Sequence, residues 1–360
     1  MNGAPGTQAG RLAAALALLL AAAPLAGQEA FRLGGIEAAP GSVRSGRLEV
    51  APSGGDAGTF IPLTVVHGAR PGPVLTLVAG VHGSEYAPIL ALLRLRPLLD
   101  PAEISGTVVL VHMANLPAFL GRTIYFSPDD RKNLNRVFPG KPDGTLTERL
   151  AHTLTEEVIV RSDYLMDIHS GDGNEWLRPS YTGYYAEAGG AEVIGKSRRM
   201  AIAFGLDAIV EFQGDLDPGR AIWCGSAAVA RGIPSIDVES GEMGLIEDRT
   251  IAPIVDGVLS VMRDLGMAPG EPSPTRNPLF IRERAYATSE HDGVWDPDPL
   301  VRAGQYVREG ARLGVVRDFH GNPLAEIRAP ADGIMLILLG TPPVNRGETI
   351  AVIARVEVPR

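Results

Sequence analysis

GPVLTLVAGVHGSEYAP, residues 72–88, contains the transition on which the fold and the function both depend. Its first half is a nearly continuous apolar run, which is typical of a β-strand buried on both faces of a sheet. The run ends in a turn that carries His82 and Glu85, and residues 86–99 then show the helical spacing of Leu and Ile. The stretch therefore predicts a strand, a polar turn and a helix, in that order.

The same alternation of strand and helix continues along the chain. Two strands around a Gly-rich turn are expected before residue 72. Further buried strands are expected within 106–119, 164–171 and 233–241, and an amphipathic helix is expected at 145–160. Strands alternating with helices predict an α/β fold with a mostly parallel or mixed central sheet and flanking helices.

The pattern changes at the Pro-rich segment MAPGEPSPTRNP, residues 267–278, which we interpret as a linker. Beyond it the helical periodicity disappears, and short β-type runs are punctuated by Gly and Pro. We expect a catalytic domain over 28–270 and a small all-β barrel or sandwich over 271–360.

The first residues, 1–27, form a separate segment. They contain one basic residue, Arg11, then about a dozen apolar residues and a small-residue stretch around Ala26, the layout of a secretory signal peptide. The apolar run is shorter than the roughly 20 residues that span a bilayer, which argues against a stable membrane span. We expect cleavage near residues 26–28 and a periplasmic or extracellular protein. The single Cys224 excludes an intramolecular disulfide.

Composition limits the class of partner. Apolar residues make up 45% of the chain and charged residues 21%, as in a globular protein. The net charge is -9 and there are three lysines, so the sequence argues against nucleic acid as a partner. Arginine supplies nearly all of the positive charge, and a guanidinium suits bidentate binding of carboxylates. A small carboxylate-bearing substrate is the expected partner, and a homo-oligomer is compatible with the sequence.

Polar side chains follow three of the expected strands. His82 and Glu85 follow the first, whereas His169 and Glu239 end two later ones. Ligands bind at the carboxyl ends of the strands in an open parallel sheet. Two histidines and a glutamate are a common zinc set in hydrolytic enzymes, and they leave a fourth position for water. The wide spacing of these candidates along the chain favours a catalytic zinc site over a structural one. The alternative interpretation is that His82 and Glu85 belong to an ordinary polar turn.

One aspartate beside His169 and two further histidines are interpreted separately. Asp167 lies two residues before His169 on the same strand face, where it can orient the imidazole; capping of a neighbouring backbone group is an equally good interpretation. His67 and His112 lie in or beside strands and are expected to be structural rather than metal ligands.

The loop at 121–140 lies between the first and third metal-ligand candidates. It carries three arginines and an asparagine, namely Arg122, Arg131, Asn135 and Arg136. Arginines in a loop are commonly a solvated surface. Their position between two ligand candidates favours a binding role, because a guanidinium can hold a carboxylate by two parallel hydrogen bonds or stabilise a developing oxyanion.

Four motifs occur together and in order along the chain. They are GVHGSE at 80–85, NLNRVFPG at 133–140, DIHSG at 167–171 and VESG at 238–241. In this set the sequence resembles the succinylglutamate desuccinylase and aspartoacylase family, relatives of the zinc carboxypeptidases. The resemblance covers roughly residues 45–350 and implies a zinc-dependent hydrolase of amide bonds.

The resemblance also implies a role for each matching residue. His82, Glu85 and His169 would bind one Zn2+ per chain. Asn135 and Arg136 would hold a carboxylate of the substrate.

Each catalytic residue implied by the resemblance has a second candidate close to it in the sequence. Glu239 would be the general base that takes a proton from the attacking water and returns it to the leaving nitrogen. Glu242 competes for this role, although the family pattern of glutamate, one residue and glycine fits Glu239 better. Arg122 resembles the arginine that helps to polarise the carbonyl. The insertion FSPDDRK after it leaves Arg131 as a rival.

The segment at 327–353 resembles the biotinyl or lipoyl barrel, in which a lysine carries the cofactor. No lysine occurs after Lys196, so the resemblance is one of fold only. We expect this region to shape access to the active site.

The leading functional interpretation is a zinc-dependent hydrolase that cleaves an amide, rather than an ester, in an N-acyl amino acid or similar small carboxylate. The first alternative is a zinc carboxypeptidase acting on peptides. The second is an exported protein that binds metal or ligand without catalysis. The glutamate at position 239 argues against this last interpretation, because metal binding alone needs no base.

Overall fold

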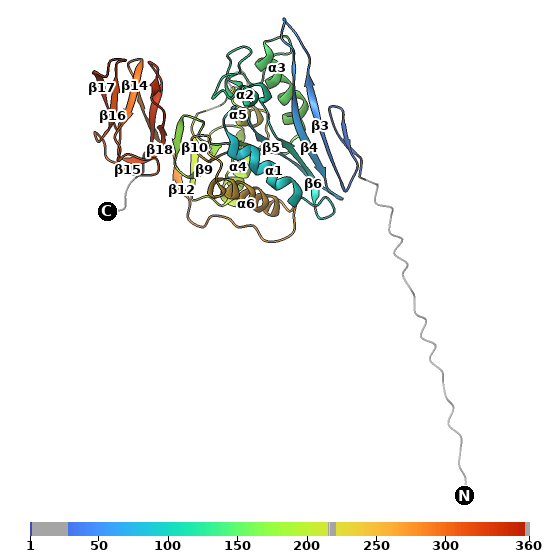
Figure 1. Ribbon diagram of the computed structural model, residues 1–360. Coiled ribbons are helices and arrows are strands. Elements are labelled where there is room, and N and C mark those ends of the chain that lie inside the picture. The colour runs from blue at the N-terminus through green and yellow to red at the C-terminus, as the bar shows by residue number, and fades with distance from the viewer. Residues whose placement is uncertain (2–27, 215, 217–220, 357–360) are drawn as a thin grey trace.

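The computed structural model describes residues 1, 28–214, 216 and 221–356 (Figure 1). The predicted signal peptide lies almost wholly outside the described residues, so its cleavage and the exported location stay predictions. Within the described part of the chain, no helix has the length and apolar character needed to cross a membrane.

A nine-stranded sheet forms the centre of the molecule, in the order β12-β10-β9-β11-β7-β5-β6-β4-β3. Its strands are β3 Ser42–Val50, β4 Thr59–His67, β5 Arg70–Ala79, β6 Ser105–Val111, β7 Tyr164–His169, β9 Ser180–Tyr185, β10 Ala208–Phe212, β11 Ser235–Ser240 and β12 Leu279–Ile281. Strands β11, β7, β5 and β6 are parallel neighbours, whereas β9 is antiparallel to β11 and β4 is antiparallel to both β6 and β3. The predicted α/β class with a mixed central sheet is confirmed. A separate two-stranded sheet, β1 Phe31–Leu33 with β2 Ile36–Ala38, precedes it.

Helices cover both faces of this sheet (Figure 1). One face packs against α1 Tyr86–Leu95, α4 Gly190–Phe204 and α6 Asp248–Asp264. The other face packs against α3 Leu146–Thr153 and α5 Cys224–Val229. The shorter elements are α2 Leu116–Gly121 and the single turns η1 Arg96–Leu98, η2 Leu134–Arg136, η3 Leu154–Val158 and η4 Ile159–Arg161. The helix predicted over 145–160 is thus α3 followed by a π-helical turn and a 3-10 turn.

The apolar run that opened the sequence forms β5. Leu75 and Leu77 belong to the core beneath α1, α4 and α6, whereas Val78 belongs to the core on the opposite face. Burial on both faces explains why this strand carries no polar alternation, and each such side chain contributes about 1.5–3 kcal/mol on burial.

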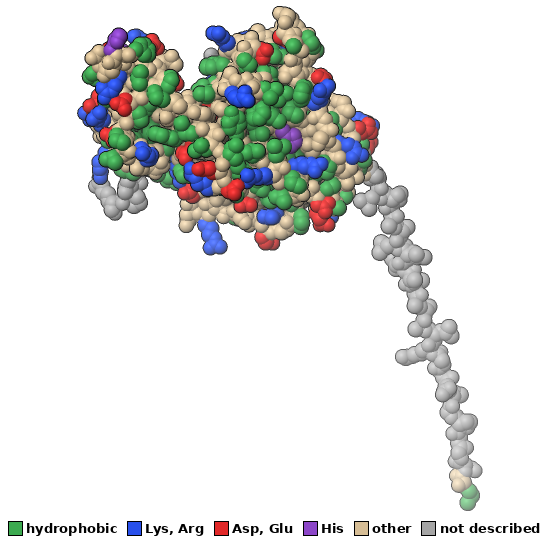
Figure 2. All heavy atoms as spheres, viewed as in Figure 1, with side chains coloured by type: hydrophobic (Ala, Val, Ile, Leu, Met, Phe, Trp, Pro, Cys, Tyr) green, Lys and Arg blue, Asp and Glu red, His purple; other side chains and the backbone are tan. Residues whose placement is uncertain are grey.

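The C-terminal part is all-β, as predicted. One sheet has the order β13-β20-β18-β15 and a second the order β17-β16-β14-β19. Their strands are β13 Arg284–Thr288, β14 Gly293–Pro297, β15 Tyr306–Val307, β16 Arg312–Arg317, β17 Pro323–Arg328, β18 Gly333–Leu339, β19 Pro343–Val344 and β20 Thr349–Ala354. Figure 2 shows a smaller lobe beside the larger one, with side chains of both charges on the face in view. The likeness to a biotinyl or lipoyl barrel stays a prediction.

Two strand pairings connect the C-terminal part of the chain with the catalytic part. The chain runs from α6 through residues 265–278 to β12, which pairs with β10 as the edge strand of the large sheet. Strand β8, Glu175–Leu177, lies in the catalytic part of the sequence but pairs with β18, so that Glu175 faces Leu339 in the register. The two parts therefore meet along β8.

The capping box at the start of α3 makes a testable contribution to stability. Glu148 accepts a hydrogen bond from the backbone N–H of Thr145 at 3.0 Å and pairs with Lys132 at 2.9 Å. The hydrogen bond from Lys132 leads the interactions that lower the pKa of Glu148 from 4.5 to about 2. A carboxyl whose pKa is lowered by folding stabilises the fold above its unfolded pKa, and that contribution is lost as the pH falls through its folded value.

We expect Glu148→Gln to lower the free energy of unfolding at pH 7 by about 1–2 kcal/mol, a typical value for a cap with a charged partner. The cost should shrink as the pH falls from about 4.5 towards about 2. Urea unfolding of both proteins at several pH values measures this difference in the free energy of unfolding. Glu157→Gln is the control, because Glu157 forms only an exposed i,i+4 pair with Arg161. A cost independent of pH would show that the carboxylate charge plays no part.

Candidate active site

The carboxyl ends of β5, β7 and β11 bring the predicted side chains to one edge of the sheet. His169 is the last residue of β7, and His82 follows β5 in the turn before α1. Glu239 lies within β11 and is the register partner of His169. Register partners on adjacent strands point to the same face, so Glu239 and His169 lie on the same side of the sheet.

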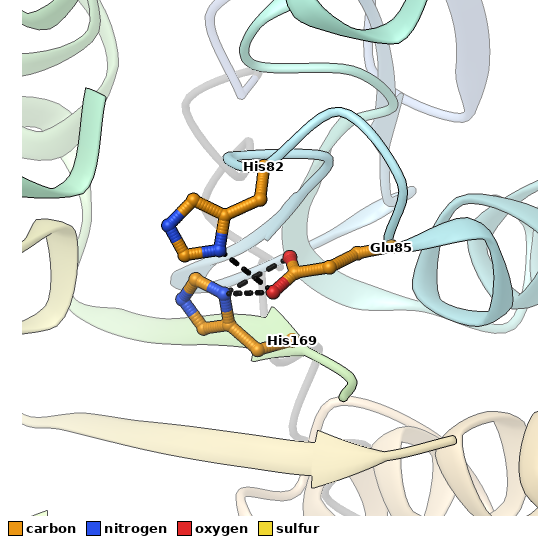
Figure 3. A group of neighbouring side chains, drawn as sticks. All are labelled: His82, Glu85 and His169. Atoms are coloured by element: carbon orange, nitrogen blue, oxygen red, sulfur yellow. Dashed lines mark hydrogen bonds and ion pairs between the residues drawn. The ribbon is translucent and has the colours of Figure 1, made fainter. Parts of the chain in front are cut away.

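Three side chains converge as the sequence predicted (Figure 3). The Nδ1 atom of His82 lies 2.8 Å from Glu85 Oε1, and the Nδ1 atom of His169 lies 3.0 Å from Glu85 Oε2. The candidate ligand atoms of all three residues lie within 4.8 Å of one another, and all three residues are buried. Figure 3 shows both imidazole rings directing Nδ1 towards the carboxylate.

The small residues of the turn make this convergence possible. A Cβ atom at Gly83 would lie 2.4 Å from the carbonyl oxygens of both Ala118 and Thr123, so only glycine fits against the end of α2. The hydroxyl of Ser84 donates to Asp172 Oδ1 at 2.9 Å and accepts from the backbone N–H of Gly173 at 3.1 Å. The turn after β5 is therefore fixed to the segment after β7.

Each histidine also meets a second carboxylate. His169 Nε2 lies 3.0 Å from Asp167 Oδ1, and His82 Nδ1 lies 3.2 Å from Asp172 Oδ2. Asp167 thus occupies the orienting position that the sequence suggested, and its other oxygen accepts from the backbone N–H of Gly225. Asp172, which follows the DIHSG motif directly, was not assigned a role from the sequence.

Burial and neighbouring charges shift the pKa values of the residues in the site. Burial opposes ionisation of His82, but Glu85 and Asp172 outweigh it and raise the pKa of His82 to about 10. Burial and the charge of Glu85 raise the pKa of Asp172 to about 7. Two imidazoles thus lie beside three carboxylates, and all five side chains are buried. An excess of buried negative charge favours a cation, and two nitrogens with one carboxylate are suitable donors for a divalent metal ion. The residues present therefore fit a metal.

Asn135 and Arg136 lie beside these donors on η2. Asn135 Oδ1 accepts from the backbone N–H of Cys224 at 2.9 Å, and Asn135 Nδ2 lies 3.5 Å from His169 Nε2. Arg136 Nη1 donates to the carbonyl oxygen of Asn135, and the guanidinium lies 5.9 Å from the ring centroid of Trp223. Among the described residues no carboxylate forms an ion pair with Arg136, so its charge is available to a ligand.

The two candidates for the carbonyl-polarising arginine lie elsewhere. Arg122 is the exposed residue that ends α2, and Arg131 is exposed in the following loop. Both have a left-handed backbone, with φ of 52° and 56°. Neither lines the cavity beside the metal-ligand cluster. The structure brings Asn135 and Arg136 to the site but leaves Arg122 and Arg131 outside it.

The two candidate bases are also distinguished by position. Burial raises the pKa of Glu239 well above its ordinary value, partly offset by His169. Glu242 instead pairs with Arg249 at 3.0 Å, away from the register position of His169. Gly241, between them, has a φ of 113° and its carbonyl oxygen accepts from Gly171 N–H, which ties the two strand ends together. The geometry favours Glu239.

A cavity of about 420 Å³ adjoins the metal-ligand cluster and is lined by both parts of the chain. The catalytic part contributes Tyr125, Arg136, Asn174 and Glu175, among others. The C-terminal part contributes Tyr286, Ile337, Leu339 and Glu348, among others. The metal-ligand candidates do not line the cavity themselves. They adjoin it through Tyr125, which lines the cavity and whose ring stands edge-on to that of His82, with the ring centroids 5.6 Å apart.

Comparison with known proteins agrees with this geometry. Residues 71–265 match the model of the succinylglutamate desuccinylase/aspartoacylase catalytic domain. The chain is 33% identical over 305 residues to the N-alpha-acetyl-L-2,4-diaminobutyric acid deacetylase of Halomonas elongata, covering 82% of this chain and 86% of the relative.

Two solved structures have a similar fold. The succinylglutamate desuccinylase/aspartoacylase of Rhodobacter sphaeroides has 27% identity and a TM-score of 0.75, over 86% of this chain and 95% of its own. The product-bound ectoine utilization protein EutE (DoeB) of Ruegeria pomeroyi has 26% identity and a TM-score of 0.76, over 86% of this chain and 94% of its own.

The fold and the site together define a hydrolase of amide bonds, of the deacylase class. The matched segment covers more than half of the chain, and the relative from Halomonas aligns over most of both sequences. The chain belongs to the succinylglutamate desuccinylase/aspartoacylase family.

Proposed function

We propose that this protein is a zinc-dependent deacylase that hydrolyses the amide bond of an N-acyl amino acid. The observation that carries the proposal is the convergence of His82 Nδ1, His169 Nδ1 and the Glu85 carboxylate, beside Glu239 on the same sheet face. Two histidines and one glutamate are the donor set that zinc takes in hydrolytic sites. When bound, the ion polarises the amide carbonyl and lowers the pKa of water.

The protein's own residues bind the substrate and move the proton. The uncompensated guanidinium of Arg136 and the Asn135 amide hold the substrate carboxylate. Glu239 takes a proton from the attacking water and delivers it to the leaving nitrogen. Because burial raises the pKa of Glu239, its carboxylate is a stronger base than an exposed glutamate.

The relative from Halomonas supports acetyl as the acyl group, since it is a deacetylase by name. The test is release of acetate from N-acetyl amino acids by the zinc-loaded protein, with short peptides as competing substrates. Acetate release supports the proposal, whereas turnover of peptides alone would identify a carboxypeptidase instead.

Arg136 provides a test of carboxylate binding. We expect Arg136→Ala to raise KM for an N-acetyl amino acid about 10–100-fold, the usual effect of losing a charge-assisted hydrogen bond. Arg136→Lys should recover only part of this loss, because an ammonium cannot donate two parallel bonds. Steady-state kinetics measures both. Arg44→Ala, an exposed change on β3, is the control. An unchanged KM in Arg136→Ala would place the substrate carboxylate elsewhere.

A further inference from the structure

The amide carbonyl lacks the arginine that the family resemblance implied. Arg122 and Arg131 are both exposed, and neither lines the cavity. Arg136 does line it, but its guanidinium is the partner of the substrate carboxylate in the proposed function. The oxygen of an attacked carbonyl becomes an oxyanion, and a fixed hydrogen-bond donor at that oxygen contributes strongly to catalysis. Such a donor therefore has to come from another residue of the site.

Tyr125 has the position that this role requires. Its side chain lines the cavity, and its ring stands edge-on to the ring of His82, with the centroids 5.6 Å apart. Its hydroxyl oxygen lies 2.6 Å from Glu175 Oε1 and 3.0 Å from Asn174 Oδ1. These two contacts hold the hydroxyl at the wall where the cavity adjoins the metal-ligand cluster.

The insertion FSPDDRK, residues 126–132, follows Tyr125 directly and explains why this residue stays at the cavity. Phe126, the first inserted residue, forms an isolated antiparallel β-bridge with Asn133, which begins the NLNR motif. The bridge closes the insertion into a loop of its own, so the added residues do not displace their neighbours. Tyr125 therefore stands at the base of this loop, next to the motif that carries Arg136.

The Tyr125 hydroxyl keeps its proton and can donate it to a ligand. Burial raises the pKa of Tyr125 well above its ordinary value, so the phenol stays neutral. Burial also raises the pKa of Glu175, which favours the carboxylic acid. A hydroxyl donates one hydrogen bond and accepts up to two. When the acid donates to the hydroxyl oxygen, the phenolic proton is free for a third partner, and the two hydrogen bonds polarise each other.

We propose that the Tyr125 hydroxyl donates a hydrogen bond to the carbonyl oxygen of the substrate, in the part that the resemblance gave to an arginine. The inference rests on the proposed function, because it concerns the amide that the deacylase cleaves. A neutral phenol acts as a fixed dipole and adds no cation to the site. Its hydrogen bond strengthens as negative charge develops on the oxygen, so it lowers the barrier more than it tightens substrate binding.

Tyr125→Phe removes the hydroxyl and keeps the ring beside His82. We expect kcat for an N-acetyl amino acid that the parent protein hydrolyses to fall about 10–100-fold, with KM little changed. The bound ion polarises the same oxygen, so the loss should be smaller than for a lone oxyanion donor. Arg136→Ala should instead raise KM, which separates the two roles. Tyr306→Phe, exposed on β15, is the matched control.

Calorimetry with the full, zinc-loaded chain tests the same hydrogen bond without turnover. The first probe is the methylphosphonamidate analogue of N-acetylalanine, whose tetrahedral phosphorus carries an oxygen in the position of the oxyanion. The second is free alanine, which has no such oxygen. We expect Tyr125→Phe to raise Kd for the analogue about 10–100-fold and to leave Kd for alanine unchanged. Equal weakening of both probes would show a merely structural role and overturn the inference.

The two measurements distinguish this inference from the proposed function. Unaltered kcat and analogue affinity in Tyr125→Phe overturn the inference and leave the deacylase intact. The same holds if the loss occurs only in Tyr286→Phe, since Tyr286 lines the cavity from the C-terminal part. A zinc-loaded parent protein that hydrolyses no N-acetyl amino acid overturns the proposed function. In that case a selective loss of analogue binding in Tyr125→Phe still supports the inference, and equal binding overturns it.

Discussion

Glu239→Gln is expected to lower kcat for an N-acetyl amino acid by about 10²–10⁴-fold, the range over which a positioned base contributes to proton transfer. The substitution preserves the shape of the side chain on β11 and removes its ability to take a proton. KM should change little, because Glu239 does not hold the substrate carboxylate. Steady-state kinetics with the zinc-loaded protein measures both parameters.

The zinc content of Glu239→Gln shows whether its lower kcat comes from loss of the base or from loss of the metal. We expect elemental analysis to give one zinc per chain in Glu239→Gln, as in the parent protein, since position 239 supplies no ligand. Glu242→Gln is the matched control, because that glutamate pairs with Arg249 instead of facing His169. Loss of activity in Glu242→Gln with retention in Glu239→Gln would reverse the assignment of the base.

His169→Ala is expected to abolish detectable turnover, a loss of at least about 10³-fold, because one of three metal donors disappears. The same variant should retain less than one zinc per chain after dialysis. Its melting temperature should no longer rise on addition of zinc, since a ligand that binds only the folded state stabilises it by mass action.

His320→Ala serves as the control for this variant, because His320 is exposed on the turn between β16 and β17. Removing zinc from the parent protein with a chelator should reproduce the loss, and zinc should restore the activity. A fully active parent protein without metal would exclude a role for a metal ion in the reaction and contradict the assignment of His82, Glu85 and His169 as metal ligands.

The metal-ligand cluster was predictable from the sequence because its geometry is set locally. A buried strand must end at the edge of the sheet, so His82, His169 and Glu239 were expected to meet there. Position in or beside an expected strand also separated His67 and His112 from these residues. The hydroxyl of Thr107 lies 2.8 Å from His67 Nδ1, and that of Thr64 lies 2.9 Å from His112 Nε2, consistent with structural roles.

Several elements escaped sequence analysis for physical reasons. Strand β9, SYTGYY, has no apolar alternation, yet all six of its residues are buried, because one face packs into the core that includes α4 and the other packs against C-terminal strands, as Tyr184 and Tyr181 show. Strand β8 is only three residues long and is stabilised by its pairing with β18, more than 150 positions later in the chain. No local pattern encodes such a pairing.

The sequence by itself determined the α/β class and the all-β C-terminal part, because the period of the apolar residues along each segment sets its secondary structure. It also determined the metal-ligand candidates and the preferred base, which stand at the ends of expected strands and within motifs that resemble a known family. Only the tertiary structure showed that neither candidate for the carbonyl-polarising role, Arg122 or Arg131, lines the cavity, whereas Arg136 does. Only the tertiary structure placed Glu175 and Glu348 on one cavity, since the antiparallel pairing of β8 with β18 brings together segments that share no sequence signal.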